Sequence, residues 1–309
     1  MHKELDVTLV IPNYNHANFL PECLNAVFSQ SYIPKEVLLI DNASTDNSRT
    51  VLRNYKEKHP QIKLIENPTN QGPVPVYNFG IHHGTGKYIA LCAADDLLFP
   101  GFFKKTVEAL EEHPHAGICC SVPSFFINKQ PYQWVQKPIS RLSKKTYISP
   151  DQIHRKFLFS PLWIPSHSSL FRRESVIECK AFPLELHHIA DWYLNIKVAM
   201  THGIVYLPES LGAFRISPTS YGARLNRNYK KKIRIYDHLF KLVQLESKQF
   251  QSKFKKSGVL GLLSADILIY QLLVPRLWPF IPRALFRKAS NFFRSSASCL
   301  RSRVSKTVA

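Results

Sequence analysis

The amino-acid sequence predicts an α/β fold with a largely parallel central sheet. Short apolar runs alternate with segments of helical periodicity through the first 122 residues, and strands that alternate with helices in this way form parallel sheets covered by helices. Two of the apolar runs end at acidic residues, namely Asp41 and the pair Asp95 and Asp96. Because ligands of such sheets bind beyond the carboxyl ends of the strands, we expect these carboxylates to line one shared crevice.

Apolar runs in the first 122 residues have the length and composition of buried strands. They cover residues 7–11, 37–40, 62–65, 87–93 and 118–122. The helices between them are marked by apolar residues at helical spacing and by start or stop residues such as Pro21, Ser44 and Pro60. These helices are expected at residues 20–28, 44–58, 73–83 and 102–112.

The pattern is less regular in the second half of the chain. Residues 123–165 are rich in Pro, Lys and Ser and yield no assignment. Beyond them the periodicity predicts a strand, a helix and two short strands. These are expected at residues 168–171, 189–202, 204–207 and 211–215. After Ser220 the pattern changes to long, basic, amphipathic helices.

Charge divides the chain of 309 residues into two unequal parts. Residues 1–222 contain 22 basic and 19 acidic side chains, whereas residues 223–309 contain 19 and 3, a net charge of +16. The first part has the size of one large domain, and the second is expected to be a helical extension. A basic segment of this kind indicates a polyanionic partner, either nucleic acid or an anionic membrane surface.

The six cysteines show no CxxC spacing, and four of them lie in apolar runs. This usage indicates reduced thiols in a cytosolic protein, with neither disulfides nor a zinc site. The sequence enters its first apolar run at residue 7, so we expect no signal peptide.

Six segments of the chain carry a specific combined signal. They are Thr8–Asn15, Leu39–Asp46, Gly86–Ala90 with Ala94–Asp96, Ser169–Arg173, Ala190–Trp192 and Phe214–Ser217. In order and spacing, across about residues 6–220, they resemble the family 2 glycosyltransferases, which have the GT-A fold. The resemblance implies a GT-A catalytic domain at residues 1–222, and the change of pattern beyond it predicts a basic helical extension at residues 223–309.

The same resemblance implies an inverting, metal-dependent hexosyltransferase. Its donor would be a UDP-, dTDP- or GDP-sugar, and its acceptor a hydroxyl of a glycan or lipid-linked molecule in cell-surface polysaccharide synthesis. The alternative is a catalytically silent relative that binds a nucleotide-sugar or a polysaccharide.

Asp95 and Asp96 correspond to the metal-binding acidic motif of the family. Hard oxygen ligands of this kind hold Mg²⁺ or Mn²⁺, which neutralises the diphosphate that leaves during sugar transfer. The family often has another Asp where this chain has Ala93, so we expect few protein ligands, with Asp96 the more direct one and Asp95 also facing the donor. The alternative is that the pair merely caps the helix that starts near Pro100.

The resemblance places Asp41 and Asn42 near the base of the nucleotide. A carboxylate accepts the imide N–H of a pyrimidine, and an Asn side chain offers both a donor and an acceptor. Pro12 and Tyr14 match the loop that packs against the base, with Tyr14 stacking on it. The alternative for Asp41 is ordinary turn chemistry, and for Asp46 helix-start chemistry is the favoured interpretation.

Asp191 matches the catalytic base of the family. Inversion needs a carboxylate that removes the proton of the acceptor hydroxyl as its oxygen attacks the anomeric carbon. Family members often carry an acidic residue just before this position, where this chain has Ala190. The alternative is an ordinary carboxylate at a helix N-terminus, stabilised by the helix dipole.

Further donor contacts are expected from Asn78 and Arg215. Asn78 stands where the family has an Asn, although the Arg that often precedes it is Tyr77 here. The guanidinium of Arg215 offers a fork of donors suited to a diphosphate. Arg172 and Arg173 either support the acceptor side or are surface charges.

The basic extension contains an apolar run, Gly258–Val274, of about 17 residues interrupted by Asp266. A membrane-spanning helix needs ~20 apolar residues, so this run is slightly short. Basic residues beside aromatic ones indicate peripheral attachment to an anionic membrane, on the cytoplasmic face. The alternative is a helix packed on the catalytic domain with a solvated basic face. No nucleic-acid-binding motif is recognised, so a nucleic-acid partner is not expected.

Overall fold

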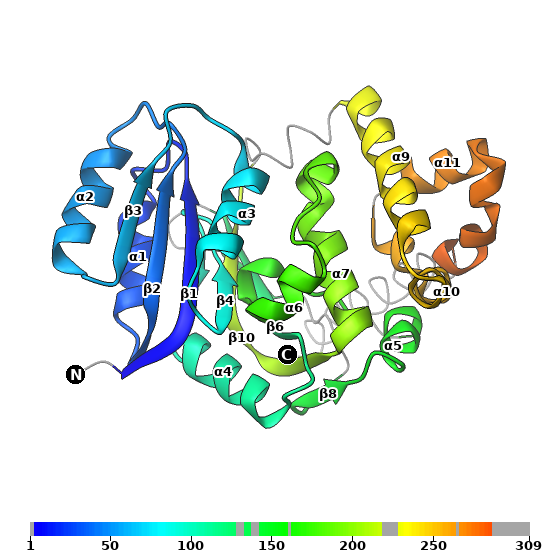
Figure 1. The fold of residues 1–309 in the computed structure, drawn as a ribbon, viewed down its shortest axis with the longest axis horizontal. Coiled ribbons are helices and arrows are strands. Elements are labelled where there is room, and N and C mark those ends of the chain that lie inside the picture. Colours follow the sequence, from blue (N-terminus) through cyan, green and yellow to red (C-terminus); the bar gives the residue numbers. More distant parts are fainter. Residues whose placement is uncertain are drawn as a thin grey trace, which may run out of the picture.

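The computed structural model describes residues 3–127, 133–136, 142–159, 162–217, 228–263 and 266–285. A ten-stranded sheet in the order β3-β2-β1-β4-β9-β6-β10-β5 runs through it, with β7 paired to β6 and β8 to β10. The strands are β1 (Lys3–Asn13), β2 (Tyr32–Asp41), β3 (Ile62–Glu66), β4 (Tyr88–Leu91), β5 (Leu97–Leu98), β6 (Ile118–Ile127), β7 (Gln133–Gln136), β8 (Thr146–Ile148), β9 (Ser169–Arg172) and β10 (Ile204–Ile216). The predicted α/β class is confirmed (Figure 1).

Helices cover both faces of this sheet. The α-helices are α1 (Leu20–Phe28), α2 (Ser48–Lys58), α3 (Pro73–His83), α4 (Phe102–Glu112), α5 (Ile153–Phe159), α6 (Arg173–Glu178), α7 (Ala190–His202), α9 (Tyr229–Leu245), α10 (Lys248–Ser257) and α11 (Asp266–Leu273). Short 3-10 helices are η1 (Ser166–Ser168), η2 (Leu184–Ile189), η3 (Val259–Leu262) and η4 (Pro275–Phe280).

The side chains of β1 alternate between two cores, as expected for a strand buried on both faces. Leu9 and Ile11 belong to the core shared with α1, α2 and α4. Val10 points to the opposite face and joins the core shared with α3, α6 and α7. This near-continuous apolar pattern marks β1 as a buried strand, and its parallel pairing with β2 and β4 aligns the carboxyl ends of the three strands along one edge.

Two features of the sheet differ from the sequence-based expectation. β9 runs antiparallel to both β4 and β6, between which it lies. The two short strands expected at 204–207 and 211–215 form one strand, β10, whose register against β6 shifts between Leu207 and Gly212. The polar bulge Pro208–Ser210 hides this continuity in the sequence, because it interrupts the apolar pattern without ending the strand.

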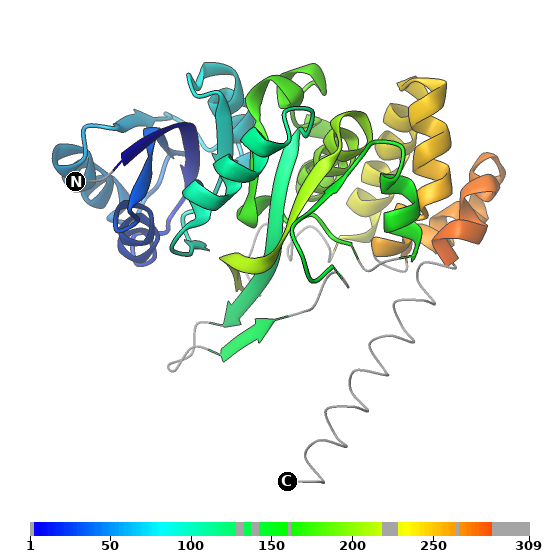
Figure 2. The ribbon, with the colours of Figure 1, turned by 90° about the horizontal axis from the view of Figure 1, so that it is seen from below.

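The unassigned region after residue 122 contributes to the sheet. β6 continues to Ile127 and pairs there with β7, and these two strands project from the body of the molecule (Figure 2). The five cysteines that the structure describes are free and buried, while Cys299 lies outside the described residues.

The helix α10 packs against α5 and α7, α9 packs against η2, and α11 packs against α9 (Figure 1). Phe254 contacts Trp192 edge to face with ring centroids 6.2 Å apart, and Phe250 contacts Tyr193 at 6.5 Å. The Glu246 carboxylate accepts a hydrogen bond of 3.0 Å from the Tyr193 hydroxyl and pairs with Lys197. The described part of the extension therefore completes the core on the α7 side.

The apolar run Gly258–Val274 does not form one continuous helix. Val259 and Leu260 in η3 and Ile267 and Tyr270 in α11 are buried in the core shared with α7 and α9. None of the described helices combines the length and the apolarity needed to cross a membrane. The expected domain boundary at residues 222 and 223 lies outside the described residues, as do the basic residues after position 285.

Candidate active site

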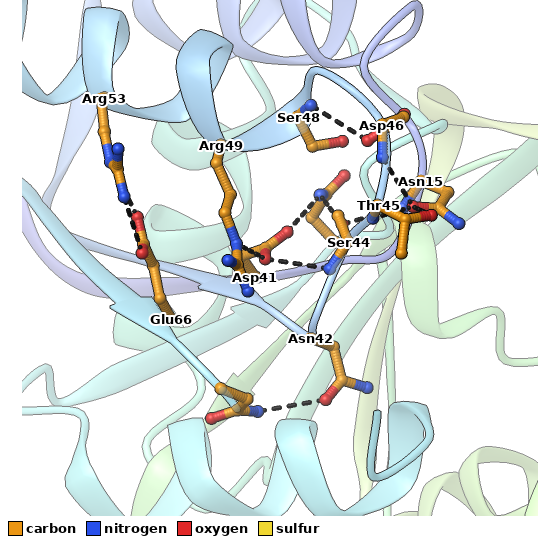
Figure 3. Close-up of polar contacts among 12 residues, drawn as sticks. Asn15, Asp41, Asn42, Ser44, Thr45, Asp46, Ser48, Arg49, Arg53 and Glu66 are labelled. Atoms are coloured by element: carbon orange, nitrogen blue, oxygen red, sulfur yellow. Dashed lines mark hydrogen bonds and ion pairs between the residues drawn. The ribbon is translucent and has the colours of Figure 1, made fainter. Parts of the chain in front are cut away.

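The carboxyl ends of β1 and β2 are joined by a network around Asp41 (Figure 3). Asn13, which pairs with Asp41 in the sheet, donates from Nδ2 to the Asp41 Oδ1 at 3.0 Å and to the Ser44 Oγ at 3.0 Å. The Ser44 N–H and the Arg49 Nε donate to the other oxygen at 3.1 and 3.0 Å. Burial acts to raise the pKa of Asp41, but these hydrogen bonds outweigh it, so the pKa lies below its usual value.

The loop after β1 is tied to the loop after β2. Asn15, at a φ of 58°, accepts hydrogen bonds at its Oδ1 from the backbone N–H of Thr45 (2.8 Å) and Asp46 (3.3 Å) (Figure 3). Asp46 in turn accepts from the backbone of Ala17 and of Ser48, the first residue of α2, both at 3.0 Å. Asp46 therefore accepts a hydrogen bond from the first residue of α2, which is the helix-start role expected from the sequence.

Asn42 connects the end of β2 to the loop before α3. Its Nδ2 donates to Asn70 and to the carbonyl of Gly72, and its Oδ1 accepts from Asn67 and the backbone of Gln71, all within 3.2 Å. Because the amide makes four hydrogen bonds to the protein, it fixes the shape of this loop.

The four residues predicted at the base therefore gather at one edge of the sheet. Pro12 is half-buried opposite Ile40, and Tyr14 follows it with a ring that is 40 % exposed. Asp41 and Asn42 are buried and hydrogen-bonded to protein groups, whereas the Tyr14 side chain is exposed to solvent. Their roles toward a nucleotide base remain predictions.

Asp95 and Asp96 form the turn between β4 and β5. Asp96 is buried, and its Oδ1 accepts a hydrogen bond of 2.9 Å from the backbone N–H of Arg215. Asp95 is half-buried, and its carboxylate has no hydrogen-bond or ion-pair partner among the residues that the structure describes. Burial, followed by the charge of Asp95, raises the pKa of Asp96 well above its usual value.

These two neighbouring carboxylates suit a divalent cation whose remaining ligands come from a bound substrate and water. No group of three or more His, Cys, Asp or Glu side chains able to hold a metal ion occurs in the described part of the chain. Mg²⁺ is commonly held by one or two carboxylates together with phosphate oxygens and water, so two carboxylates suffice when the donor is bound. A cation would also offset the repulsion that raises the pKa of Asp96.

Arg215 supports this turn from the buried side. Its Nε donates to the carbonyl of Asp95 at 2.9 Å, and its Nη2 pairs with the Glu22 carboxylate at 2.7 Å. The guanidinium also lies 4.4 Å from the ring centre of Phe19 and 4.3 Å from that of Phe126. A contact between Arg215 and a diphosphate remains a prediction, whereas the described contacts make it a positioning residue for Asp95 and Asp96.

Asp191 is the second residue of α7 and is exposed to solvent. Its Oδ2 accepts a hydrogen bond of 3.3 Å from the Ser166 hydroxyl, which itself accepts from Asn195 Nδ2 at 2.9 Å. Protein atoms around the carboxylate reduce its hydration and raise its pKa, although the hydrogen bonds from Trp192 and Ser166 act in the opposite direction. A raised pKa makes this carboxylate a stronger base.

The Tyr77 hydroxyl on α3 is influenced both by the Asp95–Asp96 pair and by Asp191. Its pKa lies well above the usual value, first because of burial and then because of nearby negative charge from Cys92, Asp96, Asp95 and Asp191. A chain of contacts connects the two groups of carboxylates. Arg215, which donates to Asp96, directly follows Phe214, and Phe214 lies 5.6 Å from His167, the residue after the Asp191 partner Ser166.

Asn78, beside Tyr77 on α3, is bonded to the segment that leads to Asp191. Its Nδ2 donates to the carbonyl of Phe182 at 2.8 Å, and its Oδ1 accepts from the backbone N–H of the same residue at 2.9 Å. The side chain thus holds α3 and the start of η2 together, while a contact with the donor remains a prediction.

Arg172 and Arg173 brace the sheet through backbone carbonyls, and a role toward an acceptor remains a prediction. Arg172 donates to the carbonyls of Leu110 and Ala116, and Arg173 to those of Ile81 and His82. Both side chains are half-buried, so neither is a free surface charge.

Comparisons with known proteins agree with this geometry. The model of the family "Glycosyl transferase family 2" matches residues 8–179. The chain is 26 % identical over 258 residues to the uncharacterized glycosyltransferase YibD of Escherichia coli, covering 80 % of this chain and 72 % of YibD.

Two solved structures show the same fold. Residues 1–349 of TarS from S. aureus, in complex with UDP-GlcNAc, match with a TM-score of 0.57 at 16 % identity, over 94 % of this chain and 92 % of that one. The mannosyltransferase PcManGT of Pyrobaculum calidifontis, in complex with GDP-Man and Mn²⁺, matches with a TM-score of 0.58 at 17 % identity, over 98 % and 81 %. The predicted GT-A architecture is thereby confirmed.

Proposed function

The chain belongs to glycosyl transferase family 2, and on this premise we propose that it is an inverting, metal-dependent hexosyltransferase. The donor would be a UDP-, dTDP- or GDP-sugar, and the acceptor a hydroxyl of a glycan or lipid-linked molecule used for cell-surface polysaccharide. The observation that carries this proposal is the contact of Phe214 with His167, whose ring centroids lie 5.6 Å apart. Phe214 directly precedes Arg215, which donates to Asp96, and His167 directly follows Ser166, which donates to Asp191. The neighbours with UDP-GlcNAc and with GDP-Man and Mn²⁺ support a nucleotide-sugar donor and a divalent ion.

The proposed reaction uses the carboxylates on opposite sides of the transferred sugar. Asp191 takes the proton of the acceptor hydroxyl while that oxygen forms a bond to the anomeric carbon. The bond between the anomeric carbon and the diphosphate oxygen breaks, and the nucleoside diphosphate leaves with the electron pair. Asp95 and Asp96 would hold a Mg²⁺ or Mn²⁺ ion, which neutralises the charge of the leaving group. Attack from the side opposite the diphosphate inverts the anomeric configuration.

Each part of the site has a supporting contact in this scheme. Ser166 orients the Asp191 carboxylate through its hydroxyl. Arg215, paired with Glu22, holds the Asp95–Asp96 turn in place. Tyr14 supplies an exposed ring at the sheet edge where the base is expected.

A screen of nucleotide-sugars tests the proposed function directly. We expect one UDP-, dTDP- or GDP-sugar to raise the Tm of the full chain when Mg²⁺ or Mn²⁺ is present. At a donor concentration 100 times Kd, binding stabilises the native state by ~2.7 kcal/mol, which for a chain of 309 residues corresponds to a rise of about 4 °C. EDTA should remove the effect. If every sugar nucleotide left the Tm unchanged, the proposal would be wrong, and metal-dependent binding without any turnover would favour the silent relative.

We further propose that the enzyme attaches peripherally to the cytoplasmic face of an anionic membrane through its extension. Residues 223–309 supply a net charge of +16, whereas residues 1–222 supply +3. Large apolar side chains are exposed in the described part of the extension, with Leu272 61 %, Trp278 56 % and Leu285 50 % accessible. The Trp278 Nε1 donates to the carbonyl of Leu272 at 3.2 Å, so these two residues are neighbours. Exposed Trp and Leu beside cationic side chains suit a lipid interface.

Membrane binding is expected to depend on this apolar pair and on salt. Burying a large apolar side chain contributes ~1.5–3 kcal/mol, so the double substitution of Leu272 and Trp278 by Ala should weaken partitioning into anionic vesicles by at least about tenfold. At 1 M salt, where charges are screened within ~3 Å, wild-type binding should weaken but persist in part. Ile177→Ala, which removes a 38 % exposed side chain on α6, serves as the control.

Co-sedimentation of the full chain with vesicles gives the measurement. A truncation at residue 222 is unsuitable, because it would uncover Trp192 and Tyr193, which Phe254 and Phe250 cover. Equal sedimentation with neutral and anionic vesicles would contradict peripheral electrostatic attachment. Resistance to both high salt and alkaline carbonate would indicate insertion instead.

A further inference from the structure

Four aromatic rings from separate segments meet near Asp191, the proposed catalytic base. Phe125 of β6 lies parallel to Trp163, with ring centroids 5.7 Å apart and an interplanar angle of 5°. Phe214 of β10 meets Phe125 edge to face at 6.3 Å, and His167 of η1 lies 5.6 Å from Phe214 and 6.3 Å from Phe125. We refer to Phe125, Trp163, His167 and Phe214 as the ring cluster.

The ring cluster is not fully covered by the protein. Phe214 is 36 % exposed, Phe125 and Trp163 are half-buried, and Ile216 continues the exposed apolar surface along β10 at 43 %. Only His167 is nearly buried. Side chains of this size are usually inside a folded protein, so a contiguous exposed group of them marks a surface that binds something.

The position of the ring cluster relates it to both groups of carboxylates. Ser166, which donates to Asp191, directly precedes His167 in η1. Arg215, whose backbone N–H donates to Asp96, directly follows Phe214 in β10. Because side chains alternate along a strand, Phe214 faces away from the side of β10 on which Arg215 contacts Phe126 and Glu22. One edge of the ring cluster is thus next to Asp191, and the other belongs to β10, the strand that is bonded to the Asp95–Asp96 turn.

Two polar groups lie beside the rings. The Ser166 side chain is half-buried, and the buried Nε2 of His167 has no hydrogen-bond partner among the described residues. Burial lowers the pKa of His167 to about 3, so its imidazole is neutral at physiological pH. No side chain of the ring cluster carries a charge, which favours a neutral ligand over a phosphate.

We propose that the ring cluster is a subsite for a sugar ring of the acceptor, which stacks on Trp163 and Phe214 with a hydroxyl directed toward Asp191. This inference rests on the proposed function and specifies its acceptor as a glycan or glycolipid whose reacting unit is a neutral sugar. The apolar C–H face of a pyranose packs against an aromatic ring, and its hydroxyls take hydrogen bonds at the rim, which is the combination that this surface offers.

Saturation-transfer NMR with the full chain tests the subsite. The probes are the methyl glycosides of glucose, galactose, mannose and N-acetylglucosamine, with glycerol phosphate as the charged alternative, all in the presence of UDP and Mg²⁺. We expect saturation transfer to at least one glycoside. Phe214→Ala and Trp163→Ala should each weaken its binding by about tenfold, the size of one aromatic contact. Phe79→Ala, which removes a 38 % exposed ring on α3, should leave it unchanged.

Two further measurements separate the possible causes of failure. Trp163→Phe keeps a ring at a position packed against Phe125 and should retain most of the binding even if Trp163→Ala destabilises the fold. UDP-dependent thermal stabilisation should be the same in all variants, because the rings lie on the acceptor side. Glycoside binding that is equal in wild type and in Phe214→Ala, or binding of glycerol phosphate alone, would overturn this inference while leaving the proposed function intact. Loss of UDP stabilisation in the wild type would instead contradict the proposed function.

Discussion

Asp96→Asn is expected to abolish sugar transfer and metal-dependent donor binding while preserving the fold. The Asn side chain keeps an oxygen that accepts the hydrogen bond from the Arg215 N–H, so the turn between β4 and β5 should hold its shape. It lacks the negative charge that holds a divalent ion. Charge stabilisation by a metal supplies several kcal/mol in the transition state, so the loss in kcat should reach roughly 10³-fold or more. Asp95→Asn should act in the same direction, less severely.

Turnover and the donor-induced rise in Tm, each with and without EDTA, provide the measurement. Asp6→Asn is the matched control, because it removes a carboxylate that is 53 % exposed near the opposite end of β1 and paired with Lys35. This control should retain wild-type turnover. Near-normal turnover of Asp96→Asn, or indifference of the wild type to EDTA, would show that the metal role of this turn is wrong.

Asp191→Asn is expected to lower kcat by ~10²–10⁴-fold, the usual contribution of a general base. Donor affinity should change little, because Asp191 acts on the acceptor hydroxyl. The variant retains an oxygen that accepts the hydrogen bond from Ser166, so the start of α7 should stay in place. Glu185→Gln removes an exposed carboxylate from the neighbouring η2 and should keep normal activity.

The pH dependence of the wild type provides a second readout for Asp191. The base acts only when it is unprotonated, and the reduced hydration of the Asp191 carboxylate by nearby protein atoms raises its pKa above the usual value. The acid limb of kcat/KM is therefore expected at higher pH than for an ordinary Asp, with activity lost as the pH falls through that pKa. Asp191→Asn should lack this limb. Loss of donor affinity at preserved kcat would instead assign Asp191 to donor binding.

Local sequence patterns were sufficient to predict many of the strands and helices of the fold. The near-continuous apolar runs of β1 and β2 and the helical periodicity of α1 and α4 each reflect burial against immediate neighbours, so they can be recognised within a few residues. The placement of Asp41 and of Asp95 and Asp96 at the ends of strands follows from the same pattern. Their gathering at one edge follows from the parallel arrangement of β1, β2 and β4.

Contacts between distant segments could not be predicted in this way. The pairing of Glu22 with Arg215 and the two hydrogen bonds between Asn78 and Phe182 join residues about one hundred or more positions apart. The sequence around each of these residues contains no signal that identifies its distant partner. The ring cluster has the same origin, since Phe125, Trp163 and Phe214 come from three separate segments and only one of them lay in a predicted strand.

The sequence by itself determined the α/β class, the strands that end in carboxylates and the basic character of the extension, because each of these is a property of composition or of local periodicity. Only the tertiary structure decided that β9 enters the sheet antiparallel between β4 and β6 and that Arg215 braces the Asp95–Asp96 turn. It also decided that the run Gly258–Val274 contributes Val259 and Tyr270 to the core beside α7. An apolar run needs burial, but its sequence does not say whether lipid or protein supplies it. Here the protein covers Val259 and Tyr270, whereas Leu272 of the same run is exposed.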